Sequence, residues 1–403
     1  MRPDCAPFSL FDGDLLNRGF ARLGLHSRHA LDLARRALLV ICLTWVPMAV
    51  LALVQGLYGG GVDARNFFAD YAAYAQFLVA LPLFIAAERV VSRSTRQAAD
   101  RFLDTGVVGP DDVPSVDASH REVERLRLWR LPEVVCIVLA YLLAFATIAP
   151  EFAGSRLQTW HTGAGEEHIF TLWGGLTLSG FWLMFVALPV LNYWWLRFAW
   201  KIAIWTRYLY RMSRLHLVLV ASHPDRTGGI GFISDVQAKF ALVIFAYGIS
   251  NVAAVITYKV AIEHASVLLP PVWGPVVGFI VGAPALFTVP LFMFTKQLFR
   301  TKWRTLALFR QQAQRYAVEY ESRWLSGATA NTDRAELTEV VSLNSMASLF
   351  ERLESMRVVP FDLRSGAEIL ASTLGSVATA LPLIRIGVPL NTWLGIVSTV
   401  LKR

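Results

Sequence analysis

Apolar stretches long enough to cross a membrane alternate with short polar segments along most of the chain. A hydrocarbon core of about 30 Å needs about 20 helical residues, whose backbone groups must satisfy one another. Six stretches meet this length: Ala37–Leu57, Ala69–Val90, Leu131–Ile148, Phe170–Leu196, Phe240–Tyr258 and Val267–Phe294. The pattern therefore predicts an all-α, polytopic membrane protein with six spans.

Polar and basic segments divide the chain further. Residues 1–36 are expected to form a cytoplasmic amphipathic segment, and residues 37–326 the six-span domain with its cytoplasmic helices and loops. Neither Gly nor Pro occurs from Val190 to His223 or from Leu291 to Ser326, so spans four and six should continue as helices beyond the bilayer. Residues 92–133 are basic and amphipathic, which is typical of helices on a membrane surface.

The C-terminal part is predicted to contain one polar helix and two short apolar runs. Residues 327–365 form the cytoplasmic helix, which Asn331 or Thr332 caps and Pro360 ends. Ser365 and Glu368 then read as a capping box. The apolar runs within residues 366–403 predict a hairpin about Gly387 and Pro389, or two further spans.

The distribution of cations predicts the orientation. At 55% hydrophobic and 17% charged residues, the 403-residue chain lies outside the range of soluble domains. Cations stay on the cytoplasmic side of short loops, and the loops after spans one, three and five carry only Arg65, Arg156 and Lys259. The N-terminus should therefore be cytoplasmic. The net charge of +8 follows from this topology, so no nucleic acid is expected as a partner.

The extension of span four should have two faces. At about 100° per residue, its basic side chains fall within about 140° and are expected to face water. His216 is expected on the apolar face. The basic set is Arg197, Lys201, Arg207, Arg211 and Arg214, and the apolar set is Phe198, Ile202, Trp205 and Leu209.

The loop "SHPDRTGGIGF" at residues 222–232 holds most of the candidate ligand or gate residues. These are His223, Asp225, Arg226, Gly228 and Gly229, with Asp235 just beyond. Four readings are open. The tripeptide resembles that of J-domain cochaperones, but a membrane span follows it. The glycine N–H groups can cradle a phosphate, although no strand and no GK[ST] accompanies them. Asp225 with His223 and Asp235 can bind a metal. In the simplest reading Pro224 stops the helix, Asp225 caps a turn and the glycines let the chain reverse.

Polar side chains within the spans are few. Glu88 is a further gate candidate, expected to pair with Arg89 or Arg93 at the interface. Asn192 and Asn251 predict interhelical hydrogen bonds. No carboxylate relay, HExxH or GxSxG motif occurs, so no metal or cofactor is expected. The three cysteines offer no disulfide framework; they are Cys5, Cys42 and Cys136. A kinked helix is predicted for span six from its prolines and GxxxG glycines, which are Pro270, Pro271, Pro275, Gly278, Gly282, Pro284 and Pro290.

Four motifs resemble a family of bacterial multi-span inner-membrane proteins. They are "RRALLVICLTWVPMAVLAL", "FLVALPLFIAAERVV", "SHPDRTGGIGF" and "MRVVPFDLRS". The resemblance implies the architecture and no chemistry. Its motif positions are Trp45, Pro47, Pro82, Glu88, His223, Pro224, Asp225, Gly228, Gly229, Pro360, Phe361 and Asp362.

Transport or sensing of a small solute or ion is the favoured function, with Glu88 and the loop forming a cytoplasmic vestibule. The alternative is a non-catalytic scaffold or assembly subunit that docks a cytoplasmic partner, or a second copy, on the long helices. A lipid-modifying enzyme is less favoured because His223 and Asp225 have no nucleophile beside them. Membrane lipids are expected partners. Arginine outnumbers lysine 32 to 6, which favours a GC-rich bacterial source and hence the inner membrane.

Overall fold

The computed structural model describes residues 6–25, 30–58, 67–68, 70–152, 160, 176–256, 270–325 and 333–379. Within these ranges the chain is helical and contains no strand, apart from one isolated bridge between Val108 and Leu217. Six helical stretches are long and apolar enough to cross a membrane: Leu31–Leu57, Tyr71–Asp104, Arg130–Ile148, Leu178–Met212, Phe232–Val252 and Gly274–Glu319. The predicted all-α, polytopic fold is confirmed.

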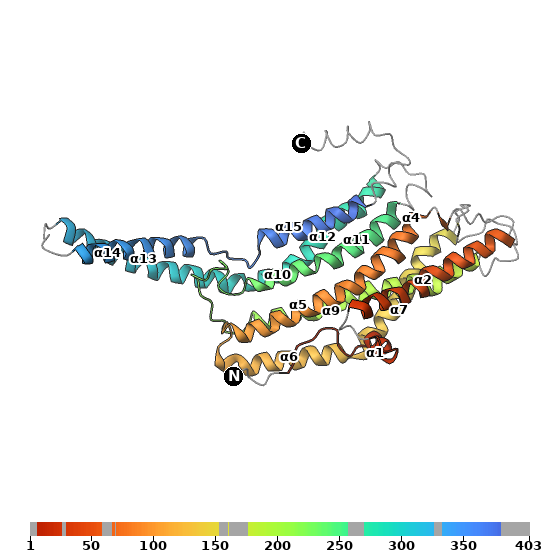
Figure 1. Ribbon diagram of the computed structural model, residues 1–403, viewed down its shortest axis with the longest axis horizontal. Coiled ribbons are helices and arrows are strands. Elements are labelled where there is room, and N and C mark those ends of the chain that lie inside the picture. Colours follow the sequence, from red (N-terminus) through yellow and green to blue (C-terminus); the bar gives the residue numbers. More distant parts are fainter. Residues whose placement is uncertain are drawn as a thin grey trace, which may run out of the picture.

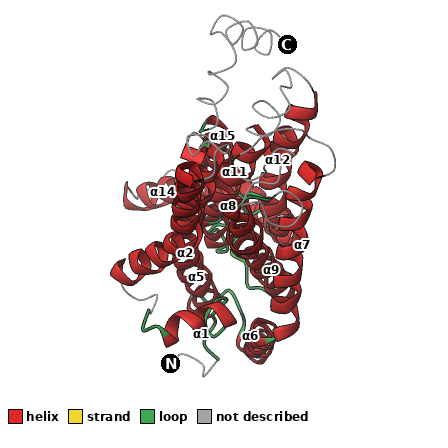
Figure 2. Cartoon of the chain, turned by 90° about the vertical axis from the view of Figure 1, so that its right-hand side faces the viewer, coloured by secondary structure: helices red, strands yellow, loops and turns green. Residues whose placement is uncertain are grey.

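The helices form an elongated bundle in which α2, α5, α7, α9, α11, α12 and α15 run along one another (Figures 1 and 2). At one end of the bundle, α5 and α9 extend and α13 and α14 project as a hairpin (Figure 1). This end carries the cations that follow spans two, four and six, and it is called the basic side below. The α-helices are α1 (Leu15–Arg22), α2 (Ala30–Tyr58), α4 (Tyr71–Ala73), α5 (Leu81–Asp104), α6 (Val113–Leu128), α7 (Arg130–Phe152), α8 (Leu178–Trp182), α9 (Leu188–Met212), α10 (Phe232–Lys239), α11 (Ala241–Ile256), α12 (Pro270–Thr288), α13 (Thr295–Leu325), α14 (Asp333–Glu354) and α15 (Leu363–Ala378).

Two spans contain a π-helical turn directly before a proline. The π segments η1 (Tyr74–Ala80) and η4 (Leu183–Ala187) precede Pro82 of α5 and Pro189 of α9. Proline lacks the N–H that an α-helix needs and crowds the preceding turn, and a wider turn relieves this conflict. In span six, Pro290 lies in a 3-10 segment, η6 (Val289–Phe294), which joins α12 to α13. A further 3-10 turn, η2 (Pro110–Asp112), leads into α6.

Helix α5 corrects the prediction of a surface helix after span two. The helix continues unbroken to Asp104, and its extension buries Thr95, Ala98 and Phe102 inside the protein. The reason is that no Gly or Pro interrupts the sequence between Pro82 and Gly106. Residues 92–104 of the basic segment are therefore part of the span-two helix, and α6 packs along α9.

Helix α9 extends beyond the predicted span, as expected, but ends at Met212. Leu217 and Val218 then follow an extended path beside residues 107–108, where Val218 N donates to Val107 O at 2.7 Å. The prediction that His216 packs on an apolar face is wrong. Its side chain is fully exposed, and its backbone N–H donates to Asp112 Oδ2 at 2.9 Å.

The C-terminal half of the described chain differs from prediction at two boundaries. Helix α14 ends at Glu354, before Pro360 is reached, and α15 begins at Leu363 with Asp362 as its N-cap. Ser365 is therefore a buried residue in the first turn of α15, so the capping box predicted for Ser365 and Glu368 is wrong. The caps predicted at Asn331 or Thr332 and the turn at Gly387 lie outside the described residues.

Helix α15 returns into the bundle and packs along α11 and α12 (Figure 1). Its first residues lie at the basic side, where Asp362 N donates to Ser234 Oγ at 3.0 Å. Its last turn lies at the opposite side, where the Tyr71 hydroxyl donates to Thr379 O at 2.7 Å. A seventh helix thus crosses most of the bundle. Gly248 of α11 permits the contact, because a Cβ there would lie 2.0 Å from Ser376 Oγ.

The two intramembrane asparagines have different roles. Asn192 of α9 donates to Ala140 O of α7 at 3.2 Å, which confirms the predicted interhelical bond. The small side chains Ala140 and Ala144 let these two helices approach closely. Asn251 instead donates to Tyr247 O within its own helix, so the interhelical prediction for Asn251 is wrong.

Candidate functional site

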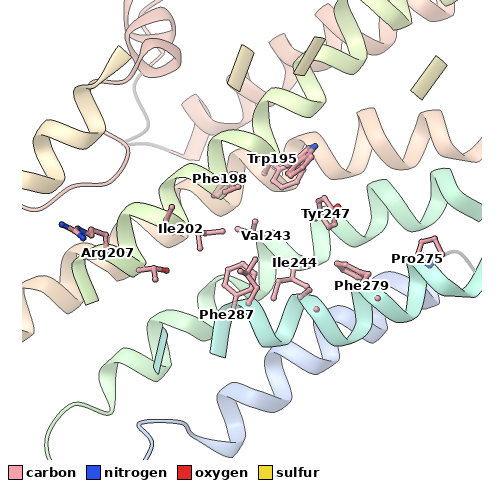
Figure 3. A pocket seen from close by; sticks show the side chains of 18 of the residues that line it. Trp195, Phe198, Ile202, Arg207, Val243, Ile244, Tyr247, Pro275, Phe279 and Phe287 are labelled. Carbon is pink, nitrogen blue, oxygen red and sulfur yellow. The ribbon is translucent and has the colours of Figure 1, made fainter. Parts of the chain in front are cut away.

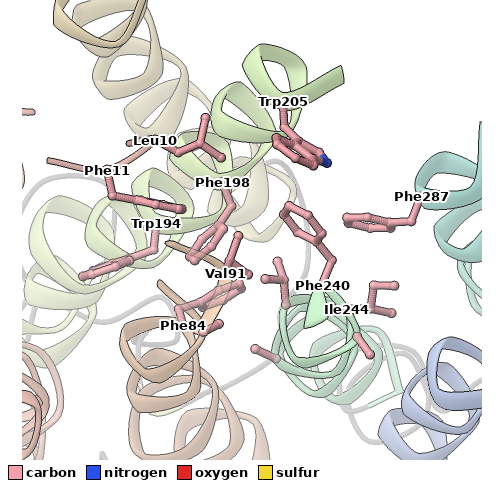
Figure 4. Close-up of a cluster of buried hydrophobic side chains, with 14 of the residues drawn as sticks. Leu10, Phe11, Phe84, Val91, Trp194, Phe198, Trp205, Phe240, Ile244 and Phe287 are labelled. Carbon is pink, nitrogen blue, oxygen red and sulfur yellow. The ribbon is translucent and has the colours of Figure 1, made fainter. Parts of the chain in front are cut away.

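The N-terminal strap, residues 6–25, lies across the basic side of the bundle and contacts α2, α5, α6, α7 and α9. Its aromatic and aliphatic side chains are inserted between the helices. Figure 4 shows Leu10 and Phe11 lying beside Trp194 and Phe198 of α9. Leu10 and Phe11 are 0% and 1% exposed. Burial of such side chains stabilises their position by about 1.5–3 kcal/mol each, so the strap is anchored by apolar packing.

A buried charge network joins the strap to the span helices. Asp14 is the N-cap of α1: its Oδ1 accepts from Asn17 N at 3.0 Å, while its Oδ2 accepts from Arg197 Nη2 at 2.7 Å. Arg197 Nε also donates to Asp14 Oδ2, at 2.9 Å, and the second terminal nitrogen, Nη1, donates to Glu88 Oε2 at 2.9 Å. Lys201 Nζ lies 3.4 Å from Asp14 Oδ2. Two cations of α9 thus face one carboxylate of the strap and one of α5.

Asn17 closes the network. Its side-chain amide donates to Glu88 Oε1 at 2.7 Å and accepts from Arg36 Nη1 at 3.0 Å. On the α7 side, Leu15 N donates to Glu133 Oε1 at 3.3 Å. The strap therefore hydrogen-bonds to charged groups on four span helices, α2, α5, α7 and α9.

The network corrects two sequence predictions. Arg197 and Lys201 do not face water: they are 2% and 1% exposed. Glu88 pairs with Arg197 across helices and not with its neighbours Arg89 or Arg93. The periodicity of α9 places the two cations correctly on one face, but the strap covers that face and supplies their counter-ion. Arg207 and Arg211, nearer the end of α9, and Arg214 just beyond it are exposed as predicted.

Asp14 is ionised in this setting. Burial alone would raise the pKa of Asp14, but Arg197 and Lys201 outweigh it and hold that pKa below the ordinary value. At the other end of the strap, the Ala6 carbonyl lies 2.8 Å from His120 Nδ1, and burial lowers the pKa of His120. A neutral His120 with its proton on Nδ1 satisfies this contact, so the strap needs no charge there.

The polar loop at residues 222–232 is organised by Asp225. Its Oδ1 accepts from Thr227 N at 2.8 Å and its Oδ2 from Gly231 N at 3.0 Å, while Gly229 N donates to both oxygens. Burial would raise the pKa of Asp225, but these backbone donors and His223 outweigh it and keep that pKa low. The N–H groups of Gly229 and Gly231 are bound to the chain's own carboxylate and are not free to cradle a phosphate. This geometry supports the turn reading for Asp225.

The loop backbone is bent sharply. Arg226, Gly228 and Gly229 all have positive φ, at 57°, 70° and 98°. Glycine adopts this region freely, whereas an arginine adopts it only when the surroundings hold it there. The Arg226 carbonyl accepts from Arg357 N at 2.7 Å, which supplies that restraint. Gly228 packs below the loop, where an added Cβ would come within 3.3 Å of Leu219.

A polar pocket of about 560 Å³ lies between the loop, the end of α5 and the segment before α15. Arg357 Nη1 donates to Asp362 Oδ1 at 2.6 Å on its wall. Among the described residues, no three His, Cys, Asp or Glu side chains are close enough together to hold a metal ion. The charged and polar lining is Arg101, Thr105, His223, Asp225, Arg226, Thr227, Ser234, Asp235, Arg357 and Asp362.

The structure separates the predicted candidates into two places. His223, Asp225, Arg226, Gly229 and Asp235 line the loop pocket, and Gly228 supports it from below. Glu88 lies elsewhere, because 13 residues of α5 separate it from Arg101 of the pocket, or about 20 Å of helix. The "SHPDRTGGIGF" and "MRVVPFDLRS" motifs do meet at the pocket.

Sequence reasoning missed Asp14 and Asn17. The signal for them was present: two cations inside a membrane helix require a counter-ion, and "DGDLLN" offers an N-cap aspartate. Comparison with known proteins adds no assignment, since no family model, no curated protein and no solved structure matches the chain. We therefore infer the function from the geometry of the strap and the loop.

Proposed function

We propose that the chain is a bacterial inner-membrane protein with a cytoplasmic N-terminus, which moves or senses a small solute, and that the strap is its cytoplasmic gate. The excess of cations at the ends of spans two, four and six supports this orientation. The loop pocket, which also lies on the basic side, offers charged groups of both signs to a small polar solute.

The observation that carries the proposal is the buried bridge from Asp14 through Arg197 to Glu88. Buried ion pairs contribute little net stability compared with well-packed apolar side chains, so stability alone does not account for this one. Ionisable groups within membrane helices commonly mark a solute path or a switch. Here they hold a segment that covers the ends of the helices, and loss of the bridge would leave apolar packing alone to hold the strap closed.

Cysteine accessibility tests the gate. Leu10→Cys, made in a variant without Cys5, Cys42 and Cys136, reports whether the inner face of the strap reaches water. We expect slow labelling by a membrane-impermeant maleimide in inside-out vesicles, and faster labelling when Asp14→Asn is added. Ala144→Cys, buried between α7 and α9, is the control and should remain unlabelled in both backgrounds.

Solute movement is tested with the same variants in liposomes. Asp14→Asn should increase the leak of protons or K⁺ relative to the wild type, as reported by an internal pH dye or a potential-sensitive dye. If Leu10→Cys becomes accessible but the liposomes remain as tight as protein-free ones, no path crosses the membrane behind the strap. If Leu10→Cys labels no faster than Ala144→Cys in either background, the network is only structural.

A scaffold role is the second candidate, favoured by the projecting α13–α14 hairpin (Figure 1). Helix α13 has 31 residues, or about 46 Å, and carries exposed apolar side chains that include Trp303 and Leu308. Exposed apolar side chains on a projecting helix are typical of a docking surface. A stoichiometric partner that is lost from Trp303→Glu/Leu308→Glu and kept by Arg304→Gln would support this role.

A further inference from the structure

An apolar groove of about 910 Å³ runs between α9 and α12, with α5 and α11 behind it (Figure 3). Along α9 it extends from Trp195 to Tyr210, which is about 22 Å of helix. This exceeds the thickness of one leaflet, about half of the 30 Å hydrocarbon core. Gly278 and Gly282 on the α12 side open it further, because nothing lies within 4 Å of a Cβ built at either position.

The groove joins a second space at the basic side. Tyr210 and Met293 line both the groove and an adjoining pocket of about 610 Å³. This second space is lined by Arg214, Lys296 and Arg300, together with Ser213, Gln297 and Thr301. An apolar channel therefore ends in a cluster of cations.

The cations of the second space are poorly neutralised. No carboxylate lines either space, and Asp112, which binds the backbone of His216, is the acidic group at the edge. Arg214 donates to the Tyr210 hydroxyl at 2.9 Å, and no described carboxylate pairs with Lys296 or Arg300. Positive charge beside membrane-embedded apolar surface matches a molecule with an anionic head and an apolar tail.

We propose that this groove binds one anionic phospholipid, with an acyl chain between α9 and α12 and its phosphate at Lys296 and Arg300. The length and the apolar lining of the groove match an acyl chain. The cations at its end match the phosphate. Zwitterionic lipid and a second copy of the chain are the other occupants that the experiment distinguishes.

Native mass spectrometry of the purified full chain tests the proposal by measuring lipid binding, with phosphatidylglycerol or phosphatidylcholine added in defined amounts. We expect phosphatidylglycerol to bind more tightly. Lys296→Gln/Arg300→Gln should weaken it by about tenfold to thirtyfold and leave phosphatidylcholine unchanged. Arg304→Gln/Arg315→Gln is the matched control, since it removes the same charge from the same helix outside the groove.

The apolar part is tested by Gly282→Leu, which adds an apolar side chain to the groove at a position where nothing lies within 4 Å of the new Cβ. Gly274→Leu is its control, because it has equal free space on α12 but does not line the groove. We expect Gly282→Leu to remove phosphatidylglycerol binding and Gly274→Leu to retain it. Three results would each overturn the proposal. They are an equal loss of phosphatidylglycerol binding in the two charge variants, binding retained in Gly282→Leu, and equal affinity of the wild type for both lipids. So would a dimer that Gly282→Leu converts to a monomer.

Discussion

Removal of Arg197 is the sharpest test of the buried network. Arg197→Met keeps a long unbranched side chain but removes the cation that bridges Asp14 and Glu88, so that, among the described residues, Glu88 keeps no direct ion pair and Asp14 keeps only Lys201. The side chains of Asp14 and Glu88 are 0% and 7% exposed, so the uncompensated charge stays out of water. Loss of one partner of a buried pair costs about 3–5 kcal/mol. Against a total stability of about 5–15 kcal/mol, this is a large loss.

Charge balance predicts the rescue. In Arg197→Met/Glu88→Gln, one cation again faces one carboxylate, because Lys201 remains 3.4 Å from Asp14. The double variant should therefore recover most of the lost free energy of unfolding, measured by denaturant titration in mixed micelles. Arg207→Met, on the same helix with its side chain 52% exposed, is the control and should cost less than about 1 kcal/mol. A small loss in Arg197→Met, or a double variant no more stable than the single one, would refute the reasoning.

Three further predictions follow from the described contacts. Asp225→Ala deprives three backbone N–H groups of their acceptor and should lower the free energy of unfolding by about 1–3 kcal/mol, whereas His223→Ala, half-exposed, should change it little. Gly248→Ala should lower the free energy of unfolding by about 1–3 kcal/mol, and the thermal midpoint with it, because it overpacks the contact with α15, whereas Gly274→Ala should not; equal midpoints would contradict the seventh-helix contact. The ionised form of Asp14 contributes stability above its unfolded pKa, near 3.8, and this contribution is lost as pH falls through the lower folded pKa. Asp14→Asn should therefore have a lower free energy of unfolding than the wild type at pH 7. The two values should converge towards pH 3.

The spans and their extensions could be predicted because each depends on local sequence. Apolar length defines the spans, and the absence of Gly and Pro carries α5, α9 and α13 beyond the ends of the predicted spans. The same rule explains the error over residues 92–104, where charge suggested a surface helix although nothing breaks the helix. Local rules could not decide between a hairpin and a further span for α15, because its 16 residues are short for a span and its docking depends on Gly248.

The site could be predicted only in part. Proline, glycine and aspartate define the polar loop through local turn chemistry, so the loop was found and its aspartate was given a capping role. The strap depends on a pair 183 residues apart, Asp14 and Arg197, and a single sequence gives no direct signal of such a pairing. Glu88 was recognised as unusual because it is charged within a span, but its partner on α9 was assigned to the solvent face.

The strap and the lipid groove lie on opposite faces of α9 and are separated by one aromatic layer. Phe198 lines the groove, and its ring lies 5.6 Å from Phe11 of the strap and 5.7 Å from Phe84 of α5. A contiguous contact of this kind can carry coupling, but only a change in equilibrium demonstrates it. Because coupling is reciprocal, a lipid that favours the closed strap must bind the closed protein more tightly. Phosphatidylglycerol should then slow maleimide labelling of Leu10→Cys in the wild-type groove and have no effect when Gly282→Leu fills it, whereas an equal effect in both would show that the lipid acts elsewhere.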